Sequence, residues 1–169
     1  MIKLKYLIET TTRSKYTSDS DVKRMMTFPN GYYINELLSM RARSENGDLM
    51  QNCLQWSYGD GMSRNTLNNL DIEDDENYMD ISQSDYANNR FFTLNDKIGK
   101  PHATIMIDQR FNLHDVVGKQ DAPVIKKYTP YLIKFLKEFY QQIAKEKNDP
   151  QIFFKNMERL KDSLNDSQI

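Results

Sequence analysis

The sequence predicts an α+β domain in which a small antiparallel sheet is covered by a C-terminal helical hairpin and one central helix. Three observations predict it. A chain of 169 residues has the length of one domain. Its middle contains short β-prone segments separated by turn residues, and its end contains two segments with helical apolar spacing. We therefore expect residues 1–169 to form a single α+β domain with one insertion at residues 65–89.

The N-terminal segments are expected to be extended. Residues 1–12 place apolar side chains at alternate positions, which favours a half-buried strand but leaves a short helix open. Residues 11–21 are rich in Ser, Thr and Asp, whose side chains compete for backbone hydrogen bonds, so we expect a connector. Residues 28–31 read Phe-Pro-Asn-Gly, which is typical of a turn, and residues 32–38 are apolar again. This order predicts a turn that leads into a strand.

From Ser44 the apolar spacing becomes that of a helix. Leu49, Cys53 and Trp56 recur at intervals of four and three residues, so they share one helical face. A Gly-Asp-Gly sequence after Tyr58 ends the helix, because glycine propagates a helix poorly and permits left-handed turns. We expect a central helix with Cys53 on its buried side.

Residues 65–89 contain no Lys or Arg, and carboxylates crowd the middle of this stretch. Such a segment has little apolar surface to bury. We expect an acidic insertion that is exposed to solvent and that offers a binding surface. Its candidate binding residues are Asp71, Glu73, Asp74, Asp75, Glu76 and Asp80.

The segments after the insertion predict the sheet. Residues 91–94 are aromatic and β-prone, residues 95–100 contain a Gly turn, and residues 103–107 are again extended, so a hairpin is the economical interpretation. Residues 113–117 are expected to form a neighbouring strand that ends at Gly118.

Two helices are expected to close the chain. Thr129-Pro130 and Asp149-Pro150 each place an N-cap side chain before a proline at the first helical position. Each start is followed by an apolar stripe at helical spacing, which predicts that the two helices pair and cover the sheet. The stripes are Leu132, Phe135, Leu136, Phe139 and Ile143, and then Phe153, Met157, Leu160 and Leu164.

The composition excludes several classes of protein. Apolar residues make up 38% of the chain, which is too many for global disorder. A balance of 23 basic against 24 acidic residues provides no broad positive field for nucleic acid. The single Cys53 cannot form an intramolecular disulfide, and no run of 18 apolar residues is present to cross a bilayer. We expect a cytoplasmic protein that does not bind membranes.

One ordered set of residues, spread over roughly half of the chain, matches a known pattern. The residues are Gly47, Met50, Cys53 and Tyr58, then Pro101 and Thr104, then Gly118 and Lys119 before the helix over residues 129–136. This order resembles the PcfJ-like family of plasmid- and phage-encoded proteins, whose pattern has a Gly, a Met, a His-Cys pair, a Pro-x-x-Thr strand and a Gly-Lys-x-Asn turn. The resemblance implies a mobile-element context and a compact α/β fold, and it implies no particular reaction.

The sequence departs from that family pattern at four polar positions. Asn52 occupies the position of the family His, and Met106 stands where the family strand often carries Glu. Asp115 replaces a Gln, and Asp121 replaces the Asn of the turn. A site that the family shares would therefore be altered in this chain.

Cys53, His102 and Asp108 are the residue types of a cysteine hydrolase, in which a base accepts the thiol proton and a third group orients the imidazole. Asp115 is the other candidate for the orienting group. Because Cys53 shares an apolar helical face with Leu49 and Trp56, packing is the favoured role for its thiol. Two histidines and one cysteine without close ligand spacing predict neither a metal site nor a cofactor.

The leading hypothesis is a non-catalytic accessory protein of a phage or other mobile element that binds a host protein or complex in the host cytoplasm. Its candidate surfaces are the acidic insertion and a basic face of Lys119, Lys126 and Lys127, which Arg110 and Lys100 are expected to extend. The first alternative is the cysteine-dependent hydrolase or transferase. The second is a nucleic-acid-binding module that uses the basic face.

Overall fold

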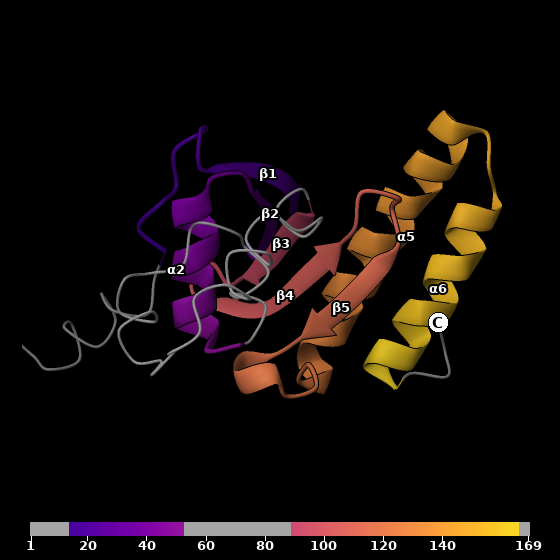
Figure 1. Cartoon of the computed structure of the whole chain (residues 1–169). Coiled ribbons are helices and arrows are strands. Elements are labelled where there is room, and N and C mark those ends of the chain that lie inside the picture. The colour runs from indigo at the N-terminus through magenta and orange to yellow at the C-terminus, as the bar shows by residue number, and fades with distance from the viewer. Residues whose placement is uncertain (1–13, 53–88, 166–169) are drawn as a thin grey trace, which may run out of the picture.

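The computed structural model describes residues 14–52 and 89–165. Five antiparallel strands form one sheet in the order of the sequence, with α2 on one face and α5 on the other (Figure 1). The strands are β1 (Val22–Thr27), β2 (Tyr33–Leu37), β3 (Arg90–Asn95), β4 (Pro101–Ile107) and β5 (Leu113–Val117). The α-helices are α2 (Met40–Met50), α5 (Thr129–Lys147) and α6 (Gln151–Leu164), and two 3-10 turns are η3 (Lys119–Asp121) and η4 (Lys126–Tyr128). The α+β prediction is confirmed.

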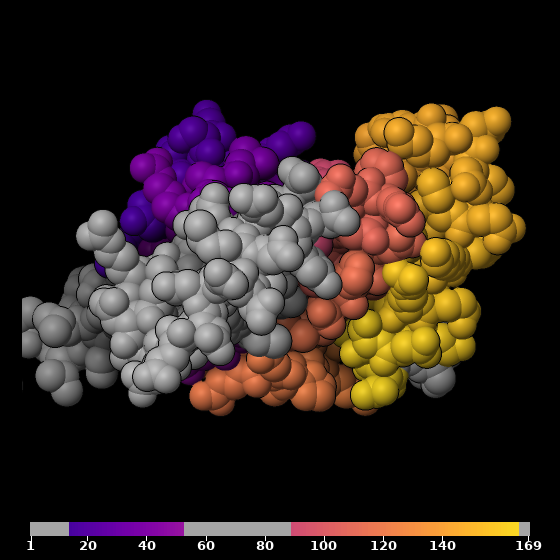
Figure 2. Space-filling view, viewed as in Figure 1, coloured from indigo at the N-terminus to yellow at the C-terminus, as the bar shows by residue number. Residues whose placement is uncertain are grey.

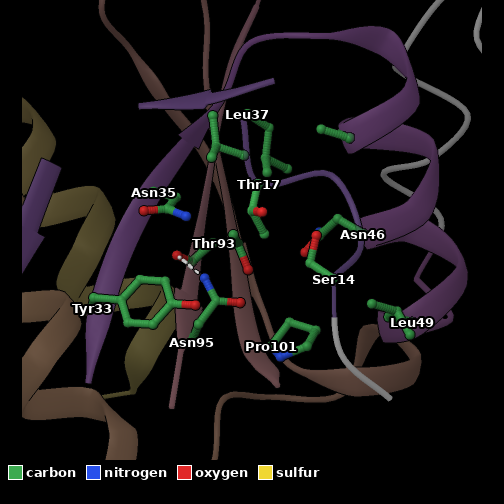
Figure 3. Close-up of a pocket in the computed structure, with 12 residues that line it drawn as sticks. Ser14, Thr17, Tyr33, Asn35, Leu37, Asn46, Leu49, Thr93, Asn95 and Pro101 are labelled. Atoms are coloured by element: carbon green, nitrogen blue, oxygen red, sulfur yellow. Dashed lines mark hydrogen bonds between the residues drawn. The ribbon is translucent and has the colours of Figure 1, made fainter. Parts of the chain in front are cut away.

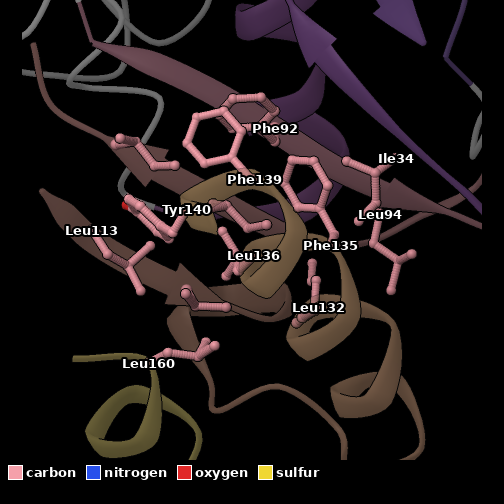
Figure 4. Packing of buried hydrophobic residues seen from close by; sticks show 14 of the residues in the cluster. Ile34, Phe92, Leu94, Leu113, Leu132, Phe135, Leu136, Phe139, Tyr140 and Leu160 are labelled. Atoms are coloured by element: carbon pink, nitrogen blue, oxygen red, sulfur yellow. The ribbon is translucent and has the colours of Figure 1, made fainter. Parts of the chain in front are cut away.

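The main hydrophobic core lies between the sheet and the C-terminal helices (Figure 4). In β4, Ala103, Ile105 and Ile107 share the face toward α5, as the two-residue period of a strand requires. In α5 the whole predicted stripe is buried. In α6, Met157 and Leu160 are buried and the rest of the stripe is partly buried against the same core. The predicted pairing of the helices over the sheet is therefore confirmed.

The central helix begins earlier than its apolar spacing predicted. Ser39 caps α2 by accepting a hydrogen bond from the amide of Ala42 at 3.2 Å, so the helix starts at Met40 rather than at Ser44. Gln51 adopts the left-handed conformation and ends the helix at Met50. The prediction of one helix running on from Leu49 to Cys53 is therefore wrong at this point, and Cys53, Trp56 and the Gly-Asp-Gly sequence lie outside the described residues.

The two predicted caps differ in outcome. Asp149 accepts a hydrogen bond from the amide of Gln151 at 3.0 Å, which confirms its capping role. Thr129 makes no capping bond at the start of α5, because η4 runs directly into the helix and Tyr128 already has helical dihedral angles. The predicted strand over residues 1–12 lies outside the described residues. The acidic insertion with its six carboxylates also lies outside them, except for residue 89 at its end.

Candidate functional site

His102 lies at a β-bulge near the start of β4. The register pairs Leu94 with Ala103 and Asn95 with Pro101, so His102 is the extra residue between them. Ala103 belongs to the core under α5, whereas Pro101 lines a small cavity on the α2 face. The bulge turns the imidazole to the α5 side, because an extra residue shifts the alternation of a strand by one position.

The imidazole of His102 pairs with Asp96 and stacks on tyrosine rings. The distance from His102 Nε2 to Asp96 Oδ2 is 2.9 Å. The imidazole lies 4.4 Å from the Tyr128 ring and 6.1 Å from the Tyr32 ring, centroid to centroid. Tyr32 stacks in turn on Tyr131, with centroids 5.0 Å apart and planes at 4°. Tyr32 also lies 6.2 Å from Tyr128, centroid to centroid, so the four rings form one cluster beside the β3–β4 turn.

Asp96 also holds that turn together. Its carboxylate accepts hydrogen bonds from the amides of Ile98 and Lys100 at 2.9 and 3.0 Å. Burial opposes ionisation of Asp96, but the hydrogen bonds from His102 and from these two amides outweigh it, so the pKa of Asp96 lies below its usual value. An ionised Asp96 is therefore the normal partner of His102.

The structure does not bring His102 and Asp108 together. They lie at opposite ends of β4, about 20 Å apart for six extended residues. Asp108 closes the β4–β5 turn, where its carboxylate accepts hydrogen bonds from the amides of Arg110 and Asn112. The predicted pairing of His102 with Asp108 is therefore wrong, and Asp96 takes that place. Cys53 lies outside the described residues.

The predicted basic residues gather at one end of the sheet. β4 begins and β5 ends there, so the β3–β4 turn lies beside the β5–α5 connection. The exposed lysines at this end, which we call the basic end, are Lys97, Lys100, Lys119, Lys126 and Lys127. Arg110, expected on the same face, belongs to the β4–β5 turn at the opposite end. The prediction is wrong for Arg110 because a strand's length separates the two turns.

The β5–α5 connection, residues 118–128, lies at the surface of the molecule (orange in Figure 2) and is held by short-range contacts. The amide of Gly118 donates to the carbonyl of Ala122 at 2.8 Å, and the amide of Tyr128 donates to the carbonyl of Ile125 at 2.9 Å. A Cβ at Gly118 would lie 3.1 Å from two carbonyl oxygens, a tight contact that glycine avoids. Gln120 and Asp121 both adopt the left-handed conformation, which is costly for residues other than glycine.

A layer of buried polar side chains lies under α2, on the other face of the sheet. Thr104 Oγ1 accepts hydrogen bonds from Asn46 at 2.8 Å and from Asn52 at 3.2 Å. Thr93 and Asn95 are buried beside a cavity of about 20 Å³ between α2 and the sheet (Figure 3). Within the described residues, Thr93 Oγ1 and Asn52 Oδ1 are buried without a hydrogen-bond partner. Groups of this kind are rare in native proteins.

The four positions at which the sequence departs from the family pattern lie near one another. Asn52 contacts Thr104 on β4, and Met106, two residues further, pairs across the sheet with Asp115. Burial raises the pKa of Asp115, His114 opposes this, and Asp121 adds to it. Gln120, beside Asp121, donates a hydrogen bond to Gln51 at 3.3 Å. Asn52 follows α2, whereas Met106, Asp115 and Asp121 come from β4, β5 and η3 much later in the sequence, so linear spacing does not reveal that they converge.

Among residues 14–52 and 89–165, no group of three or more His, Cys, Asp or Glu side chains is placed to hold a metal ion. Over the same ranges, no helix has both the length and the apolar character that crossing a bilayer requires.

The sequence did not single out Asp96, Tyr32 or Tyr128. Asp96 opens a Gly-containing turn, a signal that predicts a turn but not a histidine partner. The cluster of rings depends on the bulge at His102 and on the buried position of Tyr128 at the end of the β5–α5 connection. Comparison with known proteins adds no further site: no protein-family model, curated protein or solved structure matches this chain.

Proposed function

We propose that this chain is a non-catalytic accessory protein of a phage or other mobile element and that it binds a host protein through residues 119–127, the docking segment. The observation that carries the proposal is Ile125, which is 62% exposed and is followed by Lys126 and Lys127. A large apolar side chain in a charged surround is typical of a protein-binding surface. The resemblance to a family of plasmid- and phage-encoded proteins supports the context.

The docking segment already has a fixed conformation, and this supports binding because association would cost it little conformational entropy. The segment is closed at one end by the Gly118–Ala122 bond and at the other by the buried Tyr128 ring. A surface that already has its bound shape loses less conformational entropy on association. The left-handed Gln120 and Asp121 fit this interpretation, because costly backbone conformations cluster at functional sites.

The charge of the basic end indicates the chemistry of the partner. At this end Asp96 is bound to His102 and to backbone amides, and Asp121 lies within the docking segment beside the exposed lysines. Opposite charge on a partner steers encounter and fixes orientation, while an apolar contact contributes affinity. We therefore propose a protein partner with an apolar pocket for Ile125 and an acidic rim.

The cysteine-dependent alternative receives less support. His102 faces α5 because of the bulge, whereas Asn52, which precedes Cys53 in the sequence, contacts Thr104 on the α2 face. A general base has to reach the proton of its nucleophile within about 3 Å, or through one water molecule. His102 is already engaged by Asp96 and by the Tyr128 ring, and Cys53 lies outside the described residues.

A photo-crosslinking experiment tests the proposal. Benzoylphenylalanine is placed at Ile125 and, as a matched control, at Phe154, which is 59% exposed and lies on α6. After illumination in host cells, we expect protein adducts at position 125 that are absent at position 154 and that disappear in Lys126→Glu, Lys127→Glu.

Three outcomes would contradict the proposal. No adduct at position 125, or identical adducts at both positions, would remove the docking segment from consideration. Adducts at position 125 that nuclease digestion removes would favour the nucleic-acid-binding alternative. That alternative also requires an affinity for oligonucleotide that falls steeply with salt and weakens in Lys119→Glu.

A further inference from the structure

We infer that His102 is the positioning residue of the basic end: it fixes the docking segment against the β3–β4 turn and so sets the spacing between the lysines of the two. The inference rests on the proposed function, because it concerns the same surface. It identifies His102 as the residue that holds this surface in one conformation.

The first observation is the direction of the imidazole. In a regular strand Pro101 and Ala103 would share one face of the sheet, and His102 would point to the opposite face, away from the core that contains Ala103. The bulge changes this alternation, and it delivers the ring to the β5–α5 connection. Bulges commonly redirect a side chain for a specific purpose.

The second observation is that His102 is held from two directions by different interactions. Its Nε2 pairs with Asp96, whose carboxylate also binds the amides of Ile98 and Lys100. Its ring packs on Tyr128 with planes at 23°. The hydrogen bond therefore connects the imidazole to the turn that carries Lys97 and Lys100, and the stacking connects it to the end of the docking segment.

The third observation is the position of Tyr128 in the chain. Tyr128 is 4% exposed, its amide binds the carbonyl of Ile125, and the ammonium of Lys127 lies 4.8 Å from its ring centroid. Movement of this ring would displace Ile125 and Lys127 together. Stacking of aromatic rings stabilises a contact beyond burial alone, which biases a short connection toward one position.

Substitutions separate the two roles of the imidazole. His102→Phe keeps a ring against Tyr128 and removes the bond to Asp96, whereas His102→Gln keeps a polar partner for Asp96 and removes the ring. His102→Ala removes both. The matched control is His114→Ala, because His114 is the other histidine, its side chain is 43% exposed, and it lies 3.5 Å from Asp108 at the opposite end of the sheet.

The position of the docking segment is read from the methyl NMR signals of Ile125 in isotopically labelled protein. We expect these signals to shift and broaden in His102→Ala, to recover largely in His102→Phe, and to stay at their wild-type positions in His114→Ala. Thermal unfolding, monitored in parallel, is expected to remain cooperative in every variant. Unchanged Ile125 signals in a folded His102→Ala protein would overturn the inference.

The effect on binding is measured with a fluorescein-labelled peptide of twenty glutamates as the probe. We expect His102→Ala to weaken binding about tenfold, because two groups of lysines whose relative position is free lose the advantage of simultaneous contact. In the wild type, Lys100→Glu is expected to weaken binding clearly, and in His102→Ala the same change is expected to have a smaller effect. A role in stability alone would leave the Lys100→Glu effect the same in both backgrounds.

The outcomes for the two proposals are distinguishable. If the wild type fails to bind the glutamate peptide, the acidic partner of the proposed function is contradicted. If the wild type binds the peptide and His102→Ala binds it equally well, only the positioning role of His102 is overturned.

Discussion

Tyr140 shows how a single polar atom can lower the stability of an otherwise apolar core. Its ring is buried among the α5 side chains, and its hydroxyl has no hydrogen-bond partner in the part of the chain that the structure describes. Burial raises the pKa of Tyr140, so the hydroxyl stays protonated and carries an unmet donor. A buried group of this kind costs about 1–3 kcal/mol.

We expect Tyr140→Phe to raise the free energy of unfolding by about 1 kcal/mol, because the ring packing remains and the unmet hydroxyl is removed. The control is Tyr131→Phe, which loses the hydrogen bond from Asn30 at 2.6 Å and is expected to be neutral or slightly destabilising. Urea denaturation measures both. A Tyr140→Phe protein that is less stable than the wild type would show that the hydroxyl is satisfied in solution.

Individual site residues were predicted unevenly from the sequence. Lys119, Lys126 and Lys127 are exposed at one end of the molecule, as the basic-face hypothesis required. His102 was singled out with the wrong orienting group. Its pairing with Asp96 depends on a one-residue bulge, and a bulge changes which face a side chain occupies without leaving a mark in the apolar pattern.

Among helices and strands, α6 is joined to β5 by one buried side chain. Asn156 Oδ1 accepts the amide of Leu113 at 2.7 Å, and its Nδ2 donates to the carbonyls of Phe111 and Ile152 at 3.0 and 2.7 Å. Asn156 is 1% exposed, so water cannot easily replace these bonds. The amide thus fixes the C-terminal helix against the start of the last strand.

Asn156→Ala is expected to lower the free energy of unfolding by about 3 kcal/mol, because it leaves a buried amide and a carbonyl unpaired. The matched control is Lys155→Ala on the same helix, which is exposed and expected to change stability by less than about 0.5 kcal/mol. Chemical denaturation of the two variants checks the difference. Equal stabilities would mean that the Leu113 amide finds another partner.

The elements were predicted well wherever a regular apolar period determined them. The strand over residues 113–117 has the predicted bounds, and β3 and β4 each extend the prediction by one or two residues. The start of α2 was missed because Arg41 and Arg43 interrupt its apolar period. Its true start depends on Asp21, which accepts hydrogen bonds from Ser39 and Arg41 across a distance in sequence that no local pattern contains.

At the scale of the whole molecule, residues 14–52 and 89–165 form two unequal layers of packing on the two faces of the sheet. On the α5 side, the core contains large apolar side chains from the sheet and both C-terminal helices. On the α2 side, the apolar cluster of buried residues is Leu37, Ala42, Phe91 and Met106, beside the polar layer around Thr104. Since apolar burial provides most of the stabilisation, α2 is the weaker of the two attachments.

We expect the amides of α2 to exchange hydrogen with solvent through an opening that costs at least about 1 kcal/mol less than the opening that exposes the amides of α5. Native-state hydrogen exchange at increasing urea concentration measures both free energies. Leu132→Ala, in the α5 core, should lower both values, whereas Ala42→Gly in α2 should lower mainly the first. A single common free energy for all these amides would contradict the two-layer description.

Among the residues that the structure describes, β5 is an edge strand of the sheet, and edge strands can pair with strands of neighbouring molecules. The backbone of Leu113 is already occupied there, because Asn156 takes its amide and Arg159 donates to its carbonyl at 3.1 Å. A strand from a second chain would have to displace the side chains of Asn156 and Arg159 before it could pair with β5 at Leu113. The contacts that attach α6 to β5 therefore also hinder polymerisation through pairing at this edge strand.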